Sequence, residues 1–266
     1  MVIEMVKIIG PSFEIERVDG IAMLKRIEAA GRTCYKSEWK ITEDSHIGFI
    51  KMLLGIKPYP HESVLEHEKI TVRIICDRGI SHELVRHRLC SFSQESTRYI
   101  NYTKDRYGGE ITVIGPPPGM NGDQVAHWRH AVEVCEAMYF KLVKSGCSPQ
   151  MARSVLPNSL KTEIVITANL REWRLIFRLR TSERAHPQMR EIMVPMLAQF
   201  KKLIPIVFDD IGGMDKCPMC GGVLTLERDE AALEYDACLS CGERFYFEDA
   251  LDHWDANRPK KKGMSK

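Results

Sequence analysis

The 266-residue sequence lacks several features that define common classes of protein. It contains no run of about eighteen uncharged apolar residues, which excludes a membrane-spanning helix. Its start, MVIEMVKIIG, carries Glu4 and no long apolar stretch, so we expect no secretory signal. The chain also lacks a strong net charge, because its 38 Lys and Arg nearly balance its 36 Asp and Glu and leave a net charge of +2. This balance excludes a globally basic nucleic-acid coat but leaves local patches open.

Two further absences narrow the class of fold. No GxGxxG motif follows a predicted strand, so we expect no dinucleotide-binding Rossmann unit. No secretory route accompanies the nine cysteines, which are therefore expected to be free thiols or metal ligands and not disulfides. The compartment expected from this cysteine usage is the cytoplasm.

The composition changes along the chain and predicts three parts. Hydrophobic residues make up 44% of the sequence, enough to build a core. The segment PIVFDDIGGMDK, from Pro205 to Lys216, has a Gly pair and acids typical of a boundary. We therefore expect a main domain at residues 1–210, a small module at 211–257 and a basic flexible tail at 258–266.

Helix and strand patterns follow one another irregularly in the main domain, which predicts the α+β class. Strands are expected at residues 2–9, 69–76 and 162–168. Helices are expected at 19–30, from Thr42, from Ser81, and at 122–145, 149 onward and 187–202. The helix from Ser81 is expected to turn Leu84, Val85 and Leu89 toward the core, with Ser81 as its N-cap.

The segment GISHELVRHRLCSFSQESTRY, from Gly79 to Tyr99, concentrates groups that bind anions. Arg86, His87, Arg88 and Arg98 stand close to the hydroxyls of several Ser and Thr residues. Guanidinium groups bind phosphate oxygens bidentately, and loop hydroxyls complete such a site. A structural salt-bridge cluster would use the same residues, and this pattern alone does not separate the two interpretations.

Four segments together resemble the flavin-dependent thymidylate synthases, the ThyX family. RHR followed after seven residues by Ser96, then Arg98 and Tyr99, resembles the family signature. The segments HESVLEH (from His61), ARSVLP (containing Arg153) and ANLREWRLIFRLRTSE (containing Arg180) resemble further family segments in the same order. The resemblance covers roughly residues 1–208.

This resemblance implies a mixed helix and antiparallel-sheet domain and a methyltransferase reaction. Family members are homotetramers that share active sites between subunits and convert dUMP to dTMP, with methylenetetrahydrofolate as carbon donor. NADPH reduces the FAD, and the reduced flavin supplies the hydride. The small-molecule partners implied for this chain are therefore FAD, NADPH, dUMP and the folate.

The resemblance also implies roles for individual residues. Arg180 corresponds to the arginine that stabilises the ionised uracil ring, a task suited to a permanently charged group. The residues implied for dUMP are Glu83, Arg86, Gln94, Glu95, Ser96, Thr97, Arg98, Arg153 and Arg180. The residues implied for FAD are His61, Ser63, Arg86, His87, Arg88, Gln94, Asn169, Arg171 and Leu175.

Three of these positions carry an open question. Ser96 can be read as a nucleophile or as a hydrogen-bonding residue, and binding is favoured because its neighbours supply no reliable base. Glu83 stands where many members have Gln, and a carboxylate there repels phosphate unless an arginine pairs with it. Leu175 stands where members often have Asn or His, so only a backbone contact with the flavin survives.

The C-terminal module carries a metal-ligand pattern. Cys217 and Cys220, then seventeen residues, then Cys238 and Cys241 have zinc-ribbon spacing. Four thiolates close a tetrahedron and leave no place for substrate, so the expected zinc is structural. Typical family members lack this module.

Two alternative functions remain open. A zinc ribbon, a basic tail and the RHR patch also fit a nucleic-acid-binding protein, although the acids of the module weaken that reading. A related enzyme that acts on another pyrimidine nucleotide is the second alternative. We expect no interaction with a membrane.

Overall fold

The structure, a computed structural model, describes residues 6–56, 59–104 and 109–211, together with the backbone of three short C-terminal strands. The chain separates into two compact units, Met1–Ile56 with Pro60–Gly212 and Lys57–Tyr59 with Gly213–Lys266. Each is described by itself. None of the helices in the described ranges is both long and apolar enough to cross a membrane.

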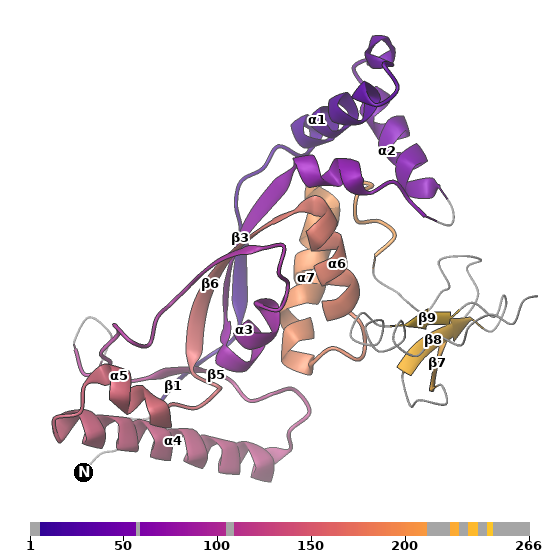
Figure 1. Cartoon of the computed structure of the whole chain (residues 1–266). Helices are drawn as coiled ribbons and strands as arrows, with labels where there is room; N and C mark the ends of the chain where they lie inside the picture. Colours follow the sequence, from indigo (N-terminus) through magenta and orange to yellow (C-terminus); the bar gives the residue numbers. More distant parts are fainter. Residues whose placement is uncertain are drawn as a thin grey trace, which may run out of the picture. The chain divides into compact units, whose positions relative to one another are not determined.

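A four-stranded antiparallel sheet organises the first unit (Figure 1). Its order is β2-β3-β6-β4, formed by β2 (Ser12–Ile15), β3 (Lys69–Asp77), β6 (Lys161–Asn169) and β4 (Ser91–Gln94). The central pair β3 and β6 is in register from Lys69 opposite Asn169 to Asp77 opposite Lys161. In both strands buried and less buried residues alternate, as expected for a period of two.

A second, two-stranded sheet lies near the long helix. Here β1 (Lys7–Ile9) pairs in parallel with β5 (Thr112–Ile114). The long helix α4 (Gly122–Lys144) begins with a capping box between Asn121 and Gln124. It ends before Gly146, whose φ of 98° is readily adopted only by glycine.

The remaining helices complete this unit. They are α1 (Gly20–Thr33), α2 (Ser45–Gly55), α3 (Arg78–Leu84), α5 (Pro149–Ala152), α6 (Leu170–Arg180) and α7 (Pro187–Leu203), with 3₁₀ turns η1 (Glu38–Lys40), η2 (Ser63–His67) and η4 (Arg153–Val155).

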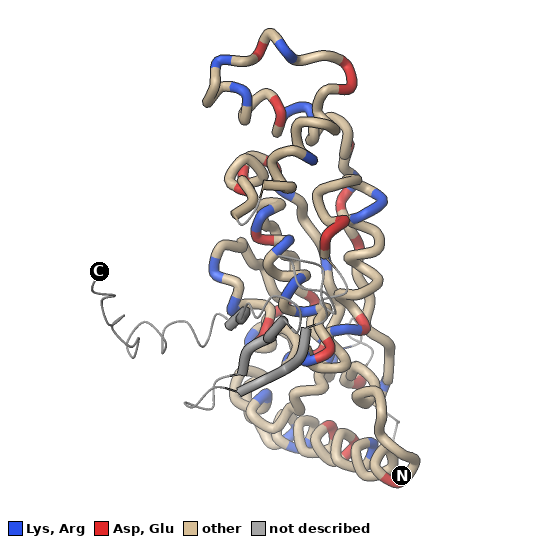
Figure 2. Tube along the Cα trace, turned by 90° about the vertical axis from the view of Figure 1, so that its right-hand side faces the viewer, with Lys and Arg blue, Asp and Glu red and all other residues tan. Residues whose placement is uncertain are grey.

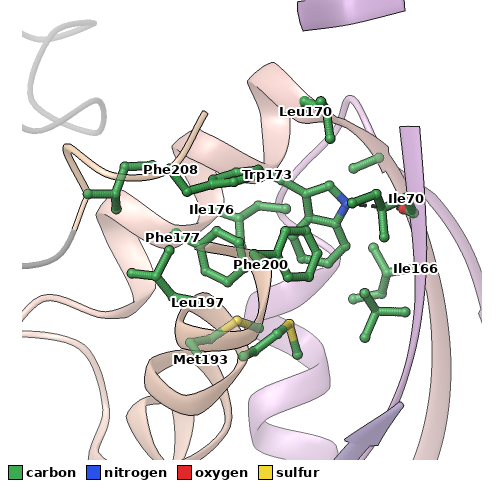
Figure 3. Close-up of a cluster of buried hydrophobic side chains, with 14 of the residues drawn as sticks. Ile70, Ile166, Leu170, Trp173, Ile176, Phe177, Met193, Leu197, Phe200 and Phe208 are labelled. Atoms are coloured by element: carbon green, nitrogen blue, oxygen red, sulfur yellow. Dashed lines mark hydrogen bonds between the residues drawn. The ribbon is translucent and has the colours of Figure 1, made fainter. Parts of the chain in front are cut away.

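The main core lies between the four-stranded sheet and the pair α6 and α7. Trp173 and Phe177 of α6 pack on Phe200 of α7, with ring centroids 4.9–5.6 Å apart (Figure 3). The indole Nε1 of Trp173 donates to the carbonyl of Ile70 on β3 at 3.0 Å, so this buried polar atom is satisfied. The contact fixes α6, and therefore the residues at its two ends, relative to the sheet.

Most sequence-based predictions of elements in the described part are confirmed, including the helices near residues 122–145 and 187–202 and the strands near 69–76 and 162–168. Asp19 is the N-cap of α1, at the start of the helix predicted for residues 19–30, since its Oδ1 accepts from Ala22 N at 3.0 Å. For the strand predicted at 2–9, Lys7–Ile9 is found, and residues 1–5 lie outside the described part.

The helix predicted from Ser81 is wrong in its start and in two of the three residues expected to face the core, whereas Leu84 is buried as predicted. It begins at Arg78, because Asp77 is the N-cap and its Oδ1 accepts from Ile80 N at 2.6 Å. It ends at Leu84, and Val85 and Leu89 are 39% and 75% exposed. The chain leaves the helix there because residues 91–94 pair with β6 at the edge of the sheet.

The second unit contains an antiparallel sheet of order β7-β8-β9 in its described part. The strands are β7 (Leu224–Arg228), β8 (Glu234–Cys238) and β9 (Arg244–Tyr246). Of the predicted zinc ligands, Cys217, Cys220 and Cys241 lie outside the described residues, and of Cys238 only the backbone is described. The tail at 258–266 also lies outside them.

Candidate active site

The RHR segment lies in the turn that connects α3 to β4. Backbone N–H groups of Arg86 and His87 donate to the carbonyls of Glu83 and Leu84, each at 3.2 Å, and these bonds form successive tight turns. Arg86 and Arg88 are exposed, whereas His87 is only 6% exposed. The turn, and not a helix, therefore sends the two guanidinium groups to the surface and the imidazole inward.

Arg180, the last residue of α6, reaches the same turn. Its Nη1 donates to Oε2 of Glu83 at 3.0 Å, and its Nη2 lies 3.4 Å from the Glu83 carbonyl oxygen. Its Nε donates to Nε2 of His87 at 3.1 Å. The structure thus brings together three of the predicted site residues, and the arginine at Glu83 supplies the pairing that its carboxylate needs.

His87 is neutral in this environment. Burial, and then the positive charge of Arg180, lower the pKa of His87 to about 4. On its other side, Nδ1 lies 3.5 Å from Oε1 of Glu172. Because the ring is uncharged near pH 7, this contact is a neutral imidazole beside a carboxyl group and not an ion pair.

A second set of predicted ligands gathers beyond β4. Nη1 of Arg153 donates to the hydroxyl of Thr97 at 3.2 Å, and the N–H of Arg98 lies 3.3 Å from the Ser96 hydroxyl oxygen. Glu95 accepts from Nζ of Lys161 at 2.9 Å. Arg98 and Arg153 are exposed, so their remaining donors face solvent. Within the described part of the chain, no hydrogen bond or ion pair joins the Thr97–Arg153 pair to Arg180.

Gln94 bonds to α3 and to β6 through part-buried contacts. Its Nε2 donates to the hydroxyls of Ser81 on α3 at 2.8 Å and Thr162 on β6 at 3.1 Å. Both donors of its amide are therefore used inside the chain, and its carbonyl oxygen is the group left for a ligand.

A third set lies along η2 and the first turn of α6. Arg171 donates from Nη1 to Oε1 of Glu66 at 2.5 Å, and both side chains are about half exposed. Asn169 is the N-cap of α6, since its Oδ1 accepts from Glu172 N at 2.8 Å. His61 and Ser63 are exposed, and Leu175 is half-buried. The capping bond leaves the amide nitrogen of Asn169 for any other contact.

A cavity of about 480 Å³ opens beside Glu83. Asp77, His186 and Gln188 contribute polar atoms to its lining, and Trp128 of α4 contributes an apolar wall. Burial raises the pKa of the Asp77 carboxyl group, whose Oδ1 caps α3. Glu83 therefore lies between Arg180 on one side and a space that admits a small molecule on the other.

Two acidic residues of the site were missed from the sequence. Glu172, 4% exposed, approaches His87, and Glu62 accepts from both Arg174 at 3.0 Å and Arg178 at 2.8 Å. An acid in the first turn of a helix is ordinarily explained by the helix dipole, so the position of Glu172 gave no separate signal. The sequence pointed to Glu62 only through its position in the HESVLEH segment, which resembles a family segment.

The described residues contain no group of three or more His, Cys, Asp or Glu placed to hold a metal ion. The side chains of the four predicted zinc ligands lie outside these residues.

Comparisons with known proteins identify the family of the chain. A family model described as thymidylate synthase complementing protein matches residues 21–206. The flavin-dependent thymidylate synthase of Pyrococcus abyssi is 35% identical over 194 residues, which are 69% of this chain and 78% of that protein. The enzyme of the same name from Geobacter sulfurreducens is 34% identical over 193 residues, or 70% and 81% of the two chains. The chain belongs to the family of flavin-dependent thymidylate synthases.

A solved structure supports the fold. A UMP/dUMP methylase, PolB from Streptomyces cacaoi bound with 5-Br dUMP, superposes with a TM-score of 0.62 at 24% identity. The match covers 77% of this chain and 96% of that one. Membership of the family, which the sequence resemblance implied, is confirmed by the family model and these relatives, and it favours an enzyme over a nucleic-acid-binding protein.

Proposed function

We propose that this chain methylates dUMP to dTMP, with methylenetetrahydrofolate as carbon donor and NADPH as the source of reducing equivalents. The observation that carries the proposal is the family match over residues 21–206, which contains every residue proposed below for the nucleotide and the flavin. Figure 2 adds that Lys and Arg are interleaved with Asp and Glu along the described trace, an arrangement that does not favour polynucleotide binding.

Arg180 is proposed to act on the uracil ring. C5 of uracil is a weak nucleophile until the ring gains electron density, and a fixed cation beside the ring carbonyl stabilises the ionised form. Glu83 and His87 hold three donor atoms of Arg180 from one side, so the guanidinium is oriented before substrate arrives. Such preorganisation avoids rearrangement in the transition state.

The exposed cations and hydroxyls are proposed to hold the rest of dUMP. Arg98 and Arg153 offer solvent-facing guanidinium donors, and Ser96 and Thr97 offer hydroxyls beside them. This combination suits a phosphate and sugar. Arg86, Glu95 and the carbonyl of Gln94 complete the proposed set.

Ser96 is proposed to bind and not to attack. In the described part of the chain, no carboxylate, imidazole or amine hydrogen-bonds to its hydroxyl, which instead accepts from the N–H of Arg98. A serine nucleophile needs a base placed to take its proton. A Ser96→Ala variant is therefore expected to lose affinity for dUMP while it retains turnover at saturation.

The residues proposed for FAD fit a dinucleotide. Arg86, Arg88 and Arg171 present exposed guanidinium groups, and His61 and Ser63 present exposed polar side chains. These are donors suited to a pyrophosphate and to ring carbonyls. When bound, FAD supplies the hydride that completes the methyl group. Asn169 contributes its amide nitrogen, Leu175 contributes a backbone contact, and His87 joins the flavin site to Arg180.

The test is formation of dTMP by the full chain. The purified protein is supplied with FAD, NADPH, methylenetetrahydrofolate and dUMP, and dTMP is measured by chromatography. Arg180→Lys is expected to lose about 100-fold or more in kcat, because a point charge does not reproduce the fork that Glu83 and His87 orient. Arg73→Lys, on an exposed pair with Glu163, is the matched control and is expected to keep full activity. Flavin retained without any dTMP, in the unsubstituted protein, would refute the proposal.

The active site is proposed to be shared between chains of a homotetramer. The support is that, among the described residues of one chain, no hydrogen bond or ion pair joins the Thr97–Arg153 pair to Arg180, which binds Glu83 instead. A dUMP bound by both sets then takes its phosphate ligands and its Arg180 from different subunits. The oligomeric mass, measured by light scattering, tests the assembly.

A structural zinc ion is proposed for the second unit. The support is the two CxxC pairs at ribbon spacing, with the three-stranded antiparallel sheet among and after them. One zinc per chain is expected by elemental analysis, and Cys217→Ser should lower that content. Zinc content unaffected by this substitution, or absent from freshly purified protein, would refute the assignment.

A further inference from the structure

Three side chains from two elements form a line through the buried part of the site. Arg180 lies at the end of α6, Glu172 lies in its first turn, and His87 enters between them from the turn after α3. Nε of Arg180 and Nε2 of His87 are 3.1 Å apart, and Nδ1 of His87 and Oε1 of Glu172 are 3.5 Å apart. Each nitrogen of the imidazole therefore faces a different partner.

The identity of these partners fixes the tautomer of His87. The guanidinium of arginine donates hydrogen bonds and accepts none, so Nε2 of His87 must accept and carries no hydrogen. The ring is neutral, so its one hydrogen is on Nδ1. That hydrogen is on the nitrogen nearest the carboxyl group of Glu172, whose Oε1 lies 3.5 Å from Nδ1.

The location of Glu172 is set by the local sequence. Asn169 caps α6 and binds the backbone N–H of Glu172 at 2.8 Å, which fixes this residue at the third helical position. Its side chain is 4% exposed, a costly place for a carboxyl group unless polar partners surround it. The helix dipole alone does not account for this burial, because an exposed acid serves the dipole equally well.

We propose that Glu172 is a positioning residue for the reaction, which holds His87 in the Nδ1–H tautomer so that Nε2 can fix the guanidinium of Arg180. The inference rests on the proposed function, because it assigns Glu172 a role through Arg180. Without an acceptor at Nδ1, the ring is free to carry its hydrogen on Nε2. In that tautomer the Nε2–H of His87 and the Nε–H of Arg180 would both be donors and could not bond to each other. The guanidinium would then lose its orientation toward the substrate.

The role differs from that of a ligand. Glu172 acts on the arginine and not on the nucleotide, so its loss is expected to change kcat and to leave KM for dUMP nearly constant. A merely structural carboxyl group would instead lower stability and the amount of active protein, with no specific effect on kcat.

The variants compare three side chains of similar length at one position. Glu172→Met removes the acceptor, and kcat for dTMP is expected to fall about 10- to 100-fold, by analogy with the loss of a carboxylate that orients a metal-ligating histidine. Glu172→Gln keeps an oxygen acceptor and is expected to return kcat to within about 3-fold of the unsubstituted protein. Glu136→Gln is the matched control: Glu136 on α4 is 5% exposed, accepts from Ile111 N, and should leave kcat unchanged. An unchanged kcat in Glu172→Met, or an equal loss in the Glu136 control, would overturn the proposal.

A direct measurement reports the tautomer without kinetics. The ¹⁵N chemical shifts of the histidine rings report which nitrogen is protonated, and the signal of His87 is assigned by its absence in His87→Gln. We expect protonated Nδ1 and unprotonated Nε2 at pH 7 in the unsubstituted chain. A ring protonated on Nε2 would overturn the proposal whatever the kinetics. A chain with the expected tautomer but no dTMP formation would instead refute the proposed function and, with it, the catalytic part of this inference.

Discussion

Arg174 binds both carboxylate oxygens of Asp210, with Nη1 to Oδ1 at 2.7 Å and Nη2 to Oδ2 at 2.6 Å. Arg174 is 1% exposed, and its Nη1 also donates to the carbonyl of Val207. Since Glu62 accepts from Nε of the same guanidinium, this one side chain ties η2 and α6 to the segment after α7. The buried guanidinium of Arg174 therefore links three separate segments of the first unit through Glu62, Asp210 and the Val207 carbonyl.

Removal of the Asp210 carboxylate should lower the free energy of unfolding. Asp210→Ala leaves Arg174 buried with fewer acceptors, and we expect a loss of about 1–3 kcal/mol. The midpoint of urea unfolding measures this loss. The neighbouring Asp209 is exposed, so Asp209→Ala serves as control and should leave the midpoint unchanged. An equal shift in both variants would contradict a specific role for the Arg174–Asp210 pair.

Stability should fall with acid between about pH 6.5 and pH 4 because of His87. Its pKa is about 4 in the folded chain, lowered first by burial and then by Arg180, and near 6.5 in the unfolded chain. The unfolded state binds a proton first as pH falls, so the stability present above pH 6.5 is lost toward pH 4, by about 3 kcal/mol in total. Urea unfolding at several pH values measures the slope. His87→Asn should flatten it over this interval, and an unaltered slope in the variant would contradict the assignment.

Mixing two inactive variants tests whether sites are shared. Arg180→Lys and Arg153→Lys each damage one of the two separate ligand sets. If each site takes one set from each chain, hybrid tetramers contain some sites with neither defect, and activity should reappear on co-refolding. Sites built within one chain would stay inactive in every hybrid, which gives a clear opposite result.

Two glycines in helices should respond oppositely to alanine. A Cβ on Gly20, the first residue of α1, would lie 1.8 Å from the carbonyl oxygen of Leu203, so Gly20→Ala should destabilise the protein by about 1–3 kcal/mol. At Gly48, inside α2, no atom lies within 4 Å of the added Cβ. Gly48→Ala should therefore stabilise the protein by about 0.4–1 kcal/mol. Thermal unfolding of both variants measures the contrast, and shifts in the same direction would contradict this packing.

Local signals predicted several elements well. Asp19 and the pair of Asn121 and Gly146 mark helix ends by capping and by positive φ, which depend on a few adjacent residues. Strand β6 was visible from its alternating β-branched residues. Caps and alternating strand patterns depend on residues a few positions apart, so they form largely independently of the rest of the fold.

Other expectations failed where distant contacts compete with local preference. The apolar pattern of α1 places Ile21 on one face with Leu24 and Ile27, yet Ile21 is 46% exposed. In α2, the apolar pattern groups Ile47 and Met52 with the buried Ile50 and Leu53, yet Ile47 and Met52 are 38% and 56% exposed. An amphipathic pattern gives a broad apolar face, and only the neighbouring elements decide which part of it they cover.

The sequence by itself determined the family, through residues of fixed type at fixed spacing, and the chemistry that those residues offer. It also determined the helix ends and strands that depend on short-range contacts. Only the tertiary structure decided that Arg86 and Arg88 point outward while His87 points inward, and that Glu172 stands behind it. The physical reason is that a pair such as His87 and Arg180 is 93 residues apart in the chain. Its geometry follows from how α6 packs on the sheet through Trp173 and Ile70, which no local pattern encodes.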